Sequence, residues 1–164
     1  MNDITIRKAT PNDAEAACGV LVRSIKEICA PYYENDEEIL AQWLANKTPA
    51  NVRQWIESDR SYCVVAVNEK DLVIGFASIS GSEITLNYVV PEALHQGIGK
   101  RMLRALENHA IISGMDHIDV ISSIPAKAFY ERNGYVSSGS PQYVGHVLGD
   151  FPLVKFLNLS SHQK

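Results

Sequence analysis

The sequence predicts an α+β fold in which a mixed, mostly antiparallel sheet of about seven strands is flanked by helices. Apolar residues recur at three- and four-residue steps over residues 14–29 and 39–44, the spacing of amphipathic helices. From residue 61 onward, short apolar runs are separated by turn residues, which indicates an antiparallel meander of strands. A helical pattern over residues 97–113 then lies between two strand-like runs, which predicts a central parallel βαβ unit.

The N-terminal part contains one short strand and three helices. Residues 4–8 alternate as a strand. A helix is expected to start at Thr10-Pro11, with Thr10 as N-cap and Pro11 in the first turn, and to stop at Pro31. A second helix is expected over residues 36–46, and a third starts at Thr48-Pro49.

The remaining strands follow from turn residues and period-two patterns. Residues 61–68 and 72–80 form a hairpin, and Gly81-Ser82 leads into a strand over residues 83–90. After the helix of residues 97–113, residues 117–122 form the parallel partner strand. Pro125 opens a short helix that ends at Asn133-Gly134, and residues 135–140 and 152–158 form a closing pair of strands.

Length and composition favour one soluble domain over residues 1–164. The net charge of −4 argues against nucleic-acid binding, and no apolar run has the roughly 18 residues of a membrane span. The three cysteines, Cys18, Cys29 and Cys63, have no metal-ligand spacing, so we expect no metal site and a reduced, cytoplasmic location.

Residues 88–101, YVVPEALHQGIGKR, resemble a strand, a turn and a glycine pair that opens a helix. A helix start presents unpaired N–H groups and a partial positive charge, which suits a diphosphate. Gly97 and Gly99 would let the backbone approach such an anion closely. A glycine pair alone is also typical of an ordinary tight turn.

A second motif follows in residues 123–135, SIPAKAFYERNGY, a short helix bracketed by Pro and Gly. In this order, the two motifs make the sequence similar to the GNAT superfamily of N-acetyltransferases, which use acetyl-CoA. The Q/R-x-x-G-x-G/A signature of that family falls on residues 94–99, and its N-x-x-A-x-x-F-Y-x-x-x-G-F/Y pattern falls on residues 123–135. Three residues depart from the pattern: Leu94 replaces Arg or Gln, Ser123 replaces Asn, and Asn87 replaces a common Leu.

The resemblance implies where acetyl-CoA would bind. Backbone amides of residues 96–101 would hold the pyrophosphate, and the strand edge at residues 88–90 would pair with pantetheine. The N–H of Val89 would polarise the thioester carbonyl, and the Ser123 hydroxyl would reach a pantetheine amide. The implied cofactor-binding residues are Tyr88, Val89, Val90, Gln96, Gly97, Ile98, Gly99, Lys100, Arg101, Ser123, Ala126 and Tyr130.

The resemblance also implies a direct attack by an amine on the thioester. Tyr130 would act as the general acid that protonates the departing thiolate. An amine with a pKa near 10 must lose a proton before it attacks. Glu83, at the start of the strand before the glycine loop, is the candidate base, with His95, His146 or a water chain as alternatives.

The acceptor is expected to be a small primary amine. Five acids and no Lys or Arg lie between residues 27 and 38, which indicates either a solvated loop or a rim that attracts a cationic amine. Tyr32, Tyr33 and Trp43 could line the acceptor pocket, although Trp43 also fits the apolar stripe of its helix. The alternatives are acetylation of protein N-termini or lysines and a non-catalytic acyl-CoA sensor. A homodimer is implied only by the resemblance to the family.

Overall fold

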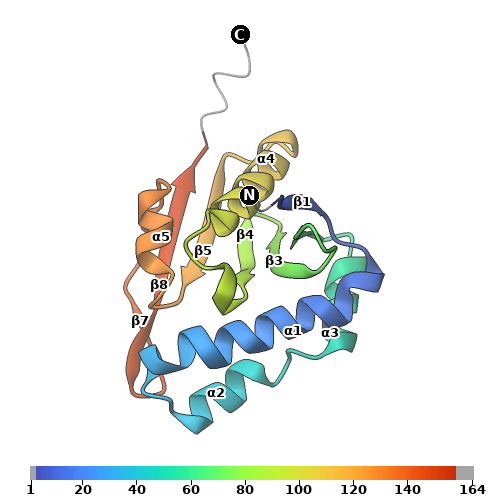
Figure 1. The fold of residues 1–164 in the computed structure, drawn as a ribbon. Helices are drawn as coiled ribbons and strands as arrows, with labels where there is room; N and C mark the ends of the chain where they lie inside the picture. Colours follow the sequence, from blue (N-terminus) through green and yellow to red (C-terminus); the bar gives the residue numbers. More distant parts are fainter. Residues whose placement is uncertain (1–2, 158–164) are drawn as a thin grey trace.

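The structure is a computed structural model that describes residues 3–157 (Figure 1). Its sheet has the strand order β1-β2-β3-β4-β5-β8-β6, and β7 pairs with β8 outside this path. All pairs are antiparallel except β4 and β5. The strands are β1 Thr5–Lys8, β2 Ser61–Val67, β3 Val73–Ser80, β4 Glu83–Val89, β5 His117–Ser122, β6 Val136–Ser137, β7 Gln142–Val144 and β8 Val147–Phe156. The predicted fold class is therefore confirmed, with eight strands instead of about seven.

Helices cover both faces of this sheet (Figure 1). On one face, α1 (Ala14–Ser24) and α3 (Pro49–Glu57) pack with Val65, Phe76 and Leu86 into one apolar cluster. On the other face, α4 (Ile98–Ile112) and α5 (Lys127–Arg132) pack with β2, β3 and β5 into a second cluster. The helix α2 (Glu37–Leu44) lies along α1 below the sheet (Figure 1).

The parallel strands β4 and β5 are paired only at their beginnings. Glu83 faces Asp119 and Ile84 faces Val120, and no later residue of β4 pairs with β5. A sheet that opens in this way leaves unpaired backbone groups along the inner edge of β4. This opening positions the candidate site described below.

The first helix does not stop at Pro31 as the sequence predicted. After α1, a π-helical turn (η2, Ile25–Cys29) and a 3-10 turn (η3, Ala30–Tyr33) continue the coil. Pro31 is tolerated because it lies in the first turn of η3, where its missing N–H is not needed. Glu34 and Asn35, both in the left-handed region with φ of 61° and 51°, end the segment.

The closing strands also differ from the prediction. The expected strand over residues 135–140 is reduced to the two residues of β6, and β7 follows it. The last strand, β8, begins at Val147 and not at Pro152, because Pro152 lies inside the strand opposite Ile121 of β5. Residue 158, the expected end of this strand, lies outside the described residues.

Candidate functional site

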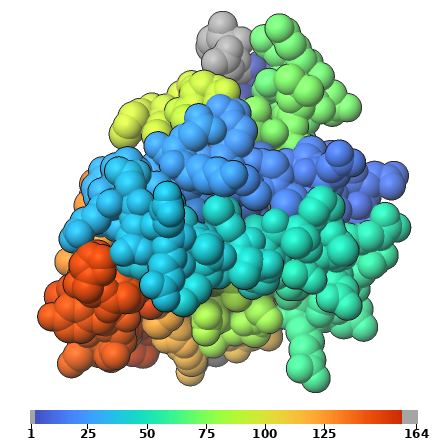
Figure 2. Space-filling view, turned by 90° about the horizontal axis from the view of Figure 1, so that it is seen from below, coloured from blue at the N-terminus to red at the C-terminus, as the bar shows by residue number. Residues whose placement is uncertain are grey.

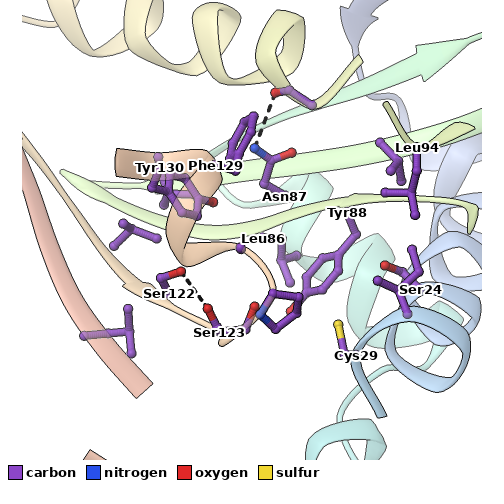
Figure 3. Close-up of a pocket in the computed structure, with 18 of the residues that line it drawn as sticks. Ser24, Cys29, Leu86, Asn87, Tyr88, Leu94, Ser122, Ser123, Phe129 and Tyr130 are labelled. Atoms are coloured by element: carbon purple, nitrogen blue, oxygen red, sulfur yellow. Dashed lines mark hydrogen bonds between the residues drawn. The ribbon is translucent and has the colours of Figure 1, made fainter. Parts of the chain in front are cut away.

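A cavity of about 1030 Å³ lies where β4 and β5 separate. Its walls come from the second half of β4, the end of β5, the first turn of α4 and α5. The turns η2 and η3, the helix α2, Val144 of β7 and Asp150 of β8 close the opposite side. Figure 3 shows Tyr88, Asn87 and Tyr130 on the sheet and α5 side, with Ser24 and Cys29 facing them.

The first turn of α4 forms one end of the cavity. Gly97 precedes the helix in the left-handed region, with a φ of 77°, which explains the requirement for glycine at this position. The Arg101 N–H already donates to the Gly97 carbonyl at 3.1 Å, so the unpaired amides of the helix start belong to residues 98–100. Gly97, Ile98, Gly99 and Lys100 line the cavity, whereas Gln96 and Arg101 do not.

The inner edge of β4 forms the adjoining wall. The Val90 N–H donates to the Ile74 carbonyl at 3.0 Å and is therefore occupied within the sheet. Consecutive residues of an antiparallel strand point their N–H groups to opposite sides, so the Val89 N–H faces the opening between β4 and β5. Tyr88 and Val89 line the cavity, and Val90 is buried behind it.

The Tyr130 side chain is buried in the same cavity, with 4% of its surface exposed. Its ring packs edge-on against Phe129 and Tyr135, at centroid distances of 5.2 and 5.4 Å. Burial raises the pKa of the Tyr130 phenol, and the Asn87 amide lowers it in part. The phenol is therefore a proton donor at neutral pH, held in one orientation by two aromatic neighbours.

Asn87 lies between Tyr130 and the start of α4 (Figure 3). Its amide nitrogen donates to the Gly99 carbonyl at 3.5 Å. Its oxygen, Oδ1, is buried and has no hydrogen-bond partner among the described residues. A buried acceptor without a partner is rare in folded proteins, so Oδ1 is available to a donor that enters the cavity.

The opposite side of the cavity is aromatic. Tyr33 and Trp43 pack edge-on with their ring centroids 5.2 Å apart, and both line the cavity. The Tyr33 hydroxyl donates to the Gly149 carbonyl at 2.8 Å and accepts from the Ile124 N–H at 3.0 Å. Tyr33 thus connects η3 to β8 and to the loop after β5. Tyr32, the third aromatic residue expected here, is 52% exposed and does not line the cavity.

The candidate bases are placed differently from one another. Glu83 is exposed at the paired beginning of β4 and does not line the cavity, because the strands separate only beyond Ile84. His95 lines the mouth in the left-handed region, with a φ of 63°. His146, in the turn between β7 and β8, binds Glu34 at 3.0 Å and lies 3.7 Å from Asp36. The structure therefore does not bring Glu83 to the other predicted site residues.

Ser123 and Ala126 line the cavity at the end of β5 and the start of α5. Two residues that the sequence analysis did not assign also line it, namely Cys29 and Asp150. Burial raises the pKa of the Cys29 thiol to about 12, so this thiol stays protonated. Asp150 could have been noticed as the one acid within the apolar run of residues 147–156.

Residues 3–157 contain no cluster of metal-ligating side chains. No helix in the same range is both long and apolar enough to cross a membrane.

Comparison with protein families matches residues 29–149 to the acetyltransferase (GNAT) domain. A GCN5-related N-acetyltransferase structure from Rhodopseudomonas palustris is similar, with a TM-score of 0.80 and 25% identity over 93% of this chain and 95% of that one. The PaiA N-acetyltransferase of Thermoplasma acidophilum, solved with coenzyme A, has a TM-score of 0.80 and 23% identity over 94% and 99% of the two chains.

A streptothricin acetyltransferase structure from Bacillus anthracis, solved with acetyl coenzyme A, is more distant. It has a TM-score of 0.57 and 20% identity over 64% of this chain and 67% of that one. Comparison with curated protein sequences finds no match.

Proposed function

Because the chain belongs to the GNAT acetyltransferase family, we propose that it transfers the acetyl group of acetyl-CoA to a primary amine of a small molecule. The observation that carries this proposal is the buried phenol of Tyr130 in a cavity that begins at the free amides of α4. The family match over residues 29–149 and the near-complete coverage by similar structures support residues 1–164 as one domain. The three buried, unpaired thiols, Cys18, Cys29 and Cys63, support a cytoplasmic location.

The residues of this chain fit a coenzyme A molecule. The amides of residues 98–100 suit its diphosphate, and Lys100 and His95 lie at the same end of the cavity. The inner edge of β4 offers the Val89 N–H to the thioester carbonyl. The unpartnered Asn87 oxygen can accept a hydrogen bond from an amide of the pantetheine arm. In the family pattern, the residue at the position of Ser123 contacts the same arm.

The chemistry follows from these positions. The neutral amine attacks the thioester carbonyl, a C–N bond forms, and the C–S bond breaks. The Tyr130 hydroxyl gives its proton to the departing sulfur, because burial raises the pKa of the phenol and keeps it protonated until the thiolate forms. Glu83 lies outside the cavity, so we assign the removal of the amine proton to water in the cavity mouth.

A small acceptor is favoured over a protein because η2, η3 and α2 close the side of the cavity opposite Tyr130. A flexible peptide would need an open groove along the sheet. The same cavity would also suit a non-catalytic acyl-CoA sensor, so the test must measure turnover.

The test compares the wild type with Tyr130→Phe in a thiol-release assay with a panel of amines. We expect turnover to fall at least roughly tenfold, with the Kd for acetyl-CoA nearly unchanged, because the substitution removes only the proton donor. Tyr143→Phe, which alters a 70% exposed ring on β7, is the matched control and should retain full activity. Binding of acetyl-CoA without turnover of any amine would contradict the proposal and favour a sensor.

A further inference from the structure

Asp150 is the single carboxylate among the described residues that line the cavity. Asp150 lies on β8 next to Phe151, and Phe151 pairs with Ser122 at the end of β5. We call this part of the cavity, together with the wall formed by η2, η3 and α2, the acceptor side. The adjacent Gly149 carbonyl accepts a hydrogen bond from the Tyr33 hydroxyl, so the aromatic side chain of Tyr33 lies close to Asp150 in the cavity wall. The Asp150 side chain is half-buried, and this burial raises the pKa of its carboxyl, so the charged form would be stabilised by a cationic partner.

Within residues 3–157, no side chain or backbone group forms a hydrogen bond or an ion pair with the Asp150 carboxylate. The nearby Tyr33 hydroxyl already donates its proton to the Gly149 carbonyl. The cavity-lining Lys47 is also engaged, since its Nζ donates to the Trp43 carbonyl at 3.2 Å and to Asn46 Oδ1 at 2.8 Å. The partner of Asp150 is therefore to be sought in a bound molecule.

We propose that Asp150 binds a cationic group of the acceptor, and that the acceptor is consequently a primary amine with a second positive charge. This inference rests on the proposed function and specifies its substrate class. The attacking nitrogen must be uncharged when it forms the C–N bond. A carboxylate bound to that nitrogen would hold its proton in place, so the charge on Asp150 is better matched by a second ammonium or guanidinium group of the same molecule.

Two further features of the cavity agree with a cationic acceptor. The half-buried Trp43, which packs edge-on with Tyr33, can contact the carbon chain between two charged ends and add cation–π attraction. Outside the cavity, Glu37 and Glu38 occupy the exposed first turn of α2, and this part of the chain lies next to the β7–β8 hairpin (Figure 2). These acids make no ion pair among the described residues and would raise the local concentration of a cation.

The experiment uses three acceptors of equal chain length: a straight-chain diamine, the corresponding alkylamine and the corresponding ω-amino acid. We expect kcat/KM for the diamine to exceed the other two by at least roughly tenfold, the effect of one charge-assisted hydrogen bond. Asp150→Asn should remove this preference, Asp150→Glu should keep most of it, and the Kd for acetyl-CoA should stay unchanged in both. Glu15→Gln, which alters an exposed acid on α1 that does not line the cavity, is the matched control and should keep the preference.

Titration of the diamine into the protein with coenzyme A present gives a readout that does not depend on turnover. Diamine binding that Asp150→Asn weakens roughly tenfold, without acetylation of any amine, would support the inference and overturn the proposed function. Acetylation with no preference for the diamine, or a preference that survives Asp150→Asn, would overturn the inference and leave the proposed function intact. An equal loss of kcat for all three acceptors in Asp150→Asn would also overturn it, because Asp150 would then act on the chemistry and not on the second charge.

Discussion

Removal of the Tyr33 hydroxyl tests how the acceptor side of the cavity is held together. The side chain is 1% exposed, and its hydroxyl accepts from the Ile124 N–H and donates to the Gly149 carbonyl. Tyr33→Phe keeps the ring and its contact with Trp43, but it leaves one backbone donor and one backbone acceptor without their partner. Each buried, unsatisfied group costs about 1–3 kcal/mol, and Ile124 is only half-buried, so water can replace part of its bond.

We therefore expect the free energy of unfolding to fall by about 2–4 kcal/mol. Urea denaturation, followed by tryptophan fluorescence, would show a lower midpoint with an unchanged m-value. Tyr32→Phe is the matched control, since the neighbouring ring is 52% exposed and should change the free energy by less than about 0.5 kcal/mol. A loss below about 0.5 kcal/mol in Tyr33→Phe would refute the reasoning, because the two hydrogen bonds would then not be what joins η3 to β8.

Two other predictions concern backbone conformation and pH. Gly97→Ala should lower the free energy of unfolding by about 1 kcal/mol, because alanine disfavours a φ of 77° although no atom lies within 4 Å of its Cβ. Gly19 lies in the exposed middle of α1 and also has no atom within 4 Å of an added Cβ, so Gly19→Ala should raise the free energy of unfolding by about 0.5–1 kcal/mol. Urea denaturation that shows both variants changing this free energy in the same direction would contradict the argument. Glu34 raises the pKa of His146, so this pair stabilises the fold fully below the unfolded pKa of about 6.5 and loses its effect as pH rises through the folded pKa. The Tm difference between wild type and His146→Gln should therefore be present at about pH 6 and absent at about pH 9, and an equal difference at both would exclude the pair as its cause.

The sequence predicted the parts of the site that depend on local chemistry. Gly97 and the helix after it are recognisable because a left-handed residue before a helix requires glycine. Tyr130 is recognisable because it lies on a short helix whose limits, Pro125 and Gly134, are close in sequence. In both cases the residues that determine the conformation lie within a few positions of the functional group.

The sequence could not predict features that depend on distant pairing. The position of Glu83 outside the cavity is one such feature, because it depends on β4 and β5 separating only after Ile84. Asp150 was missed because Pro152 suggested a strand boundary, whereas pairing with β5 extends β8 through this proline. The apolar spacing of residues 14–29 was equally compatible with an unbroken α-helix, so it did not indicate the π turn at residues 25–29.

That wider turn has a consequence for the shape of the pocket wall. Five residues in η2 take the place of the four that an α-helical turn would use, so every side chain downstream is rotated by the equivalent of one extra residue. Cys29 ends this wider turn, Tyr33 ends the 3-10 turn after it, and both line the cavity. A one-residue deletion within Ile25–Cys29 would convert the segment to regular helix and keep its hydrophobic stripe, yet reshape the wall that contacts the acceptor. Changing the number of residues in the π turn, and not only their identity, would therefore alter which molecules the pocket binds.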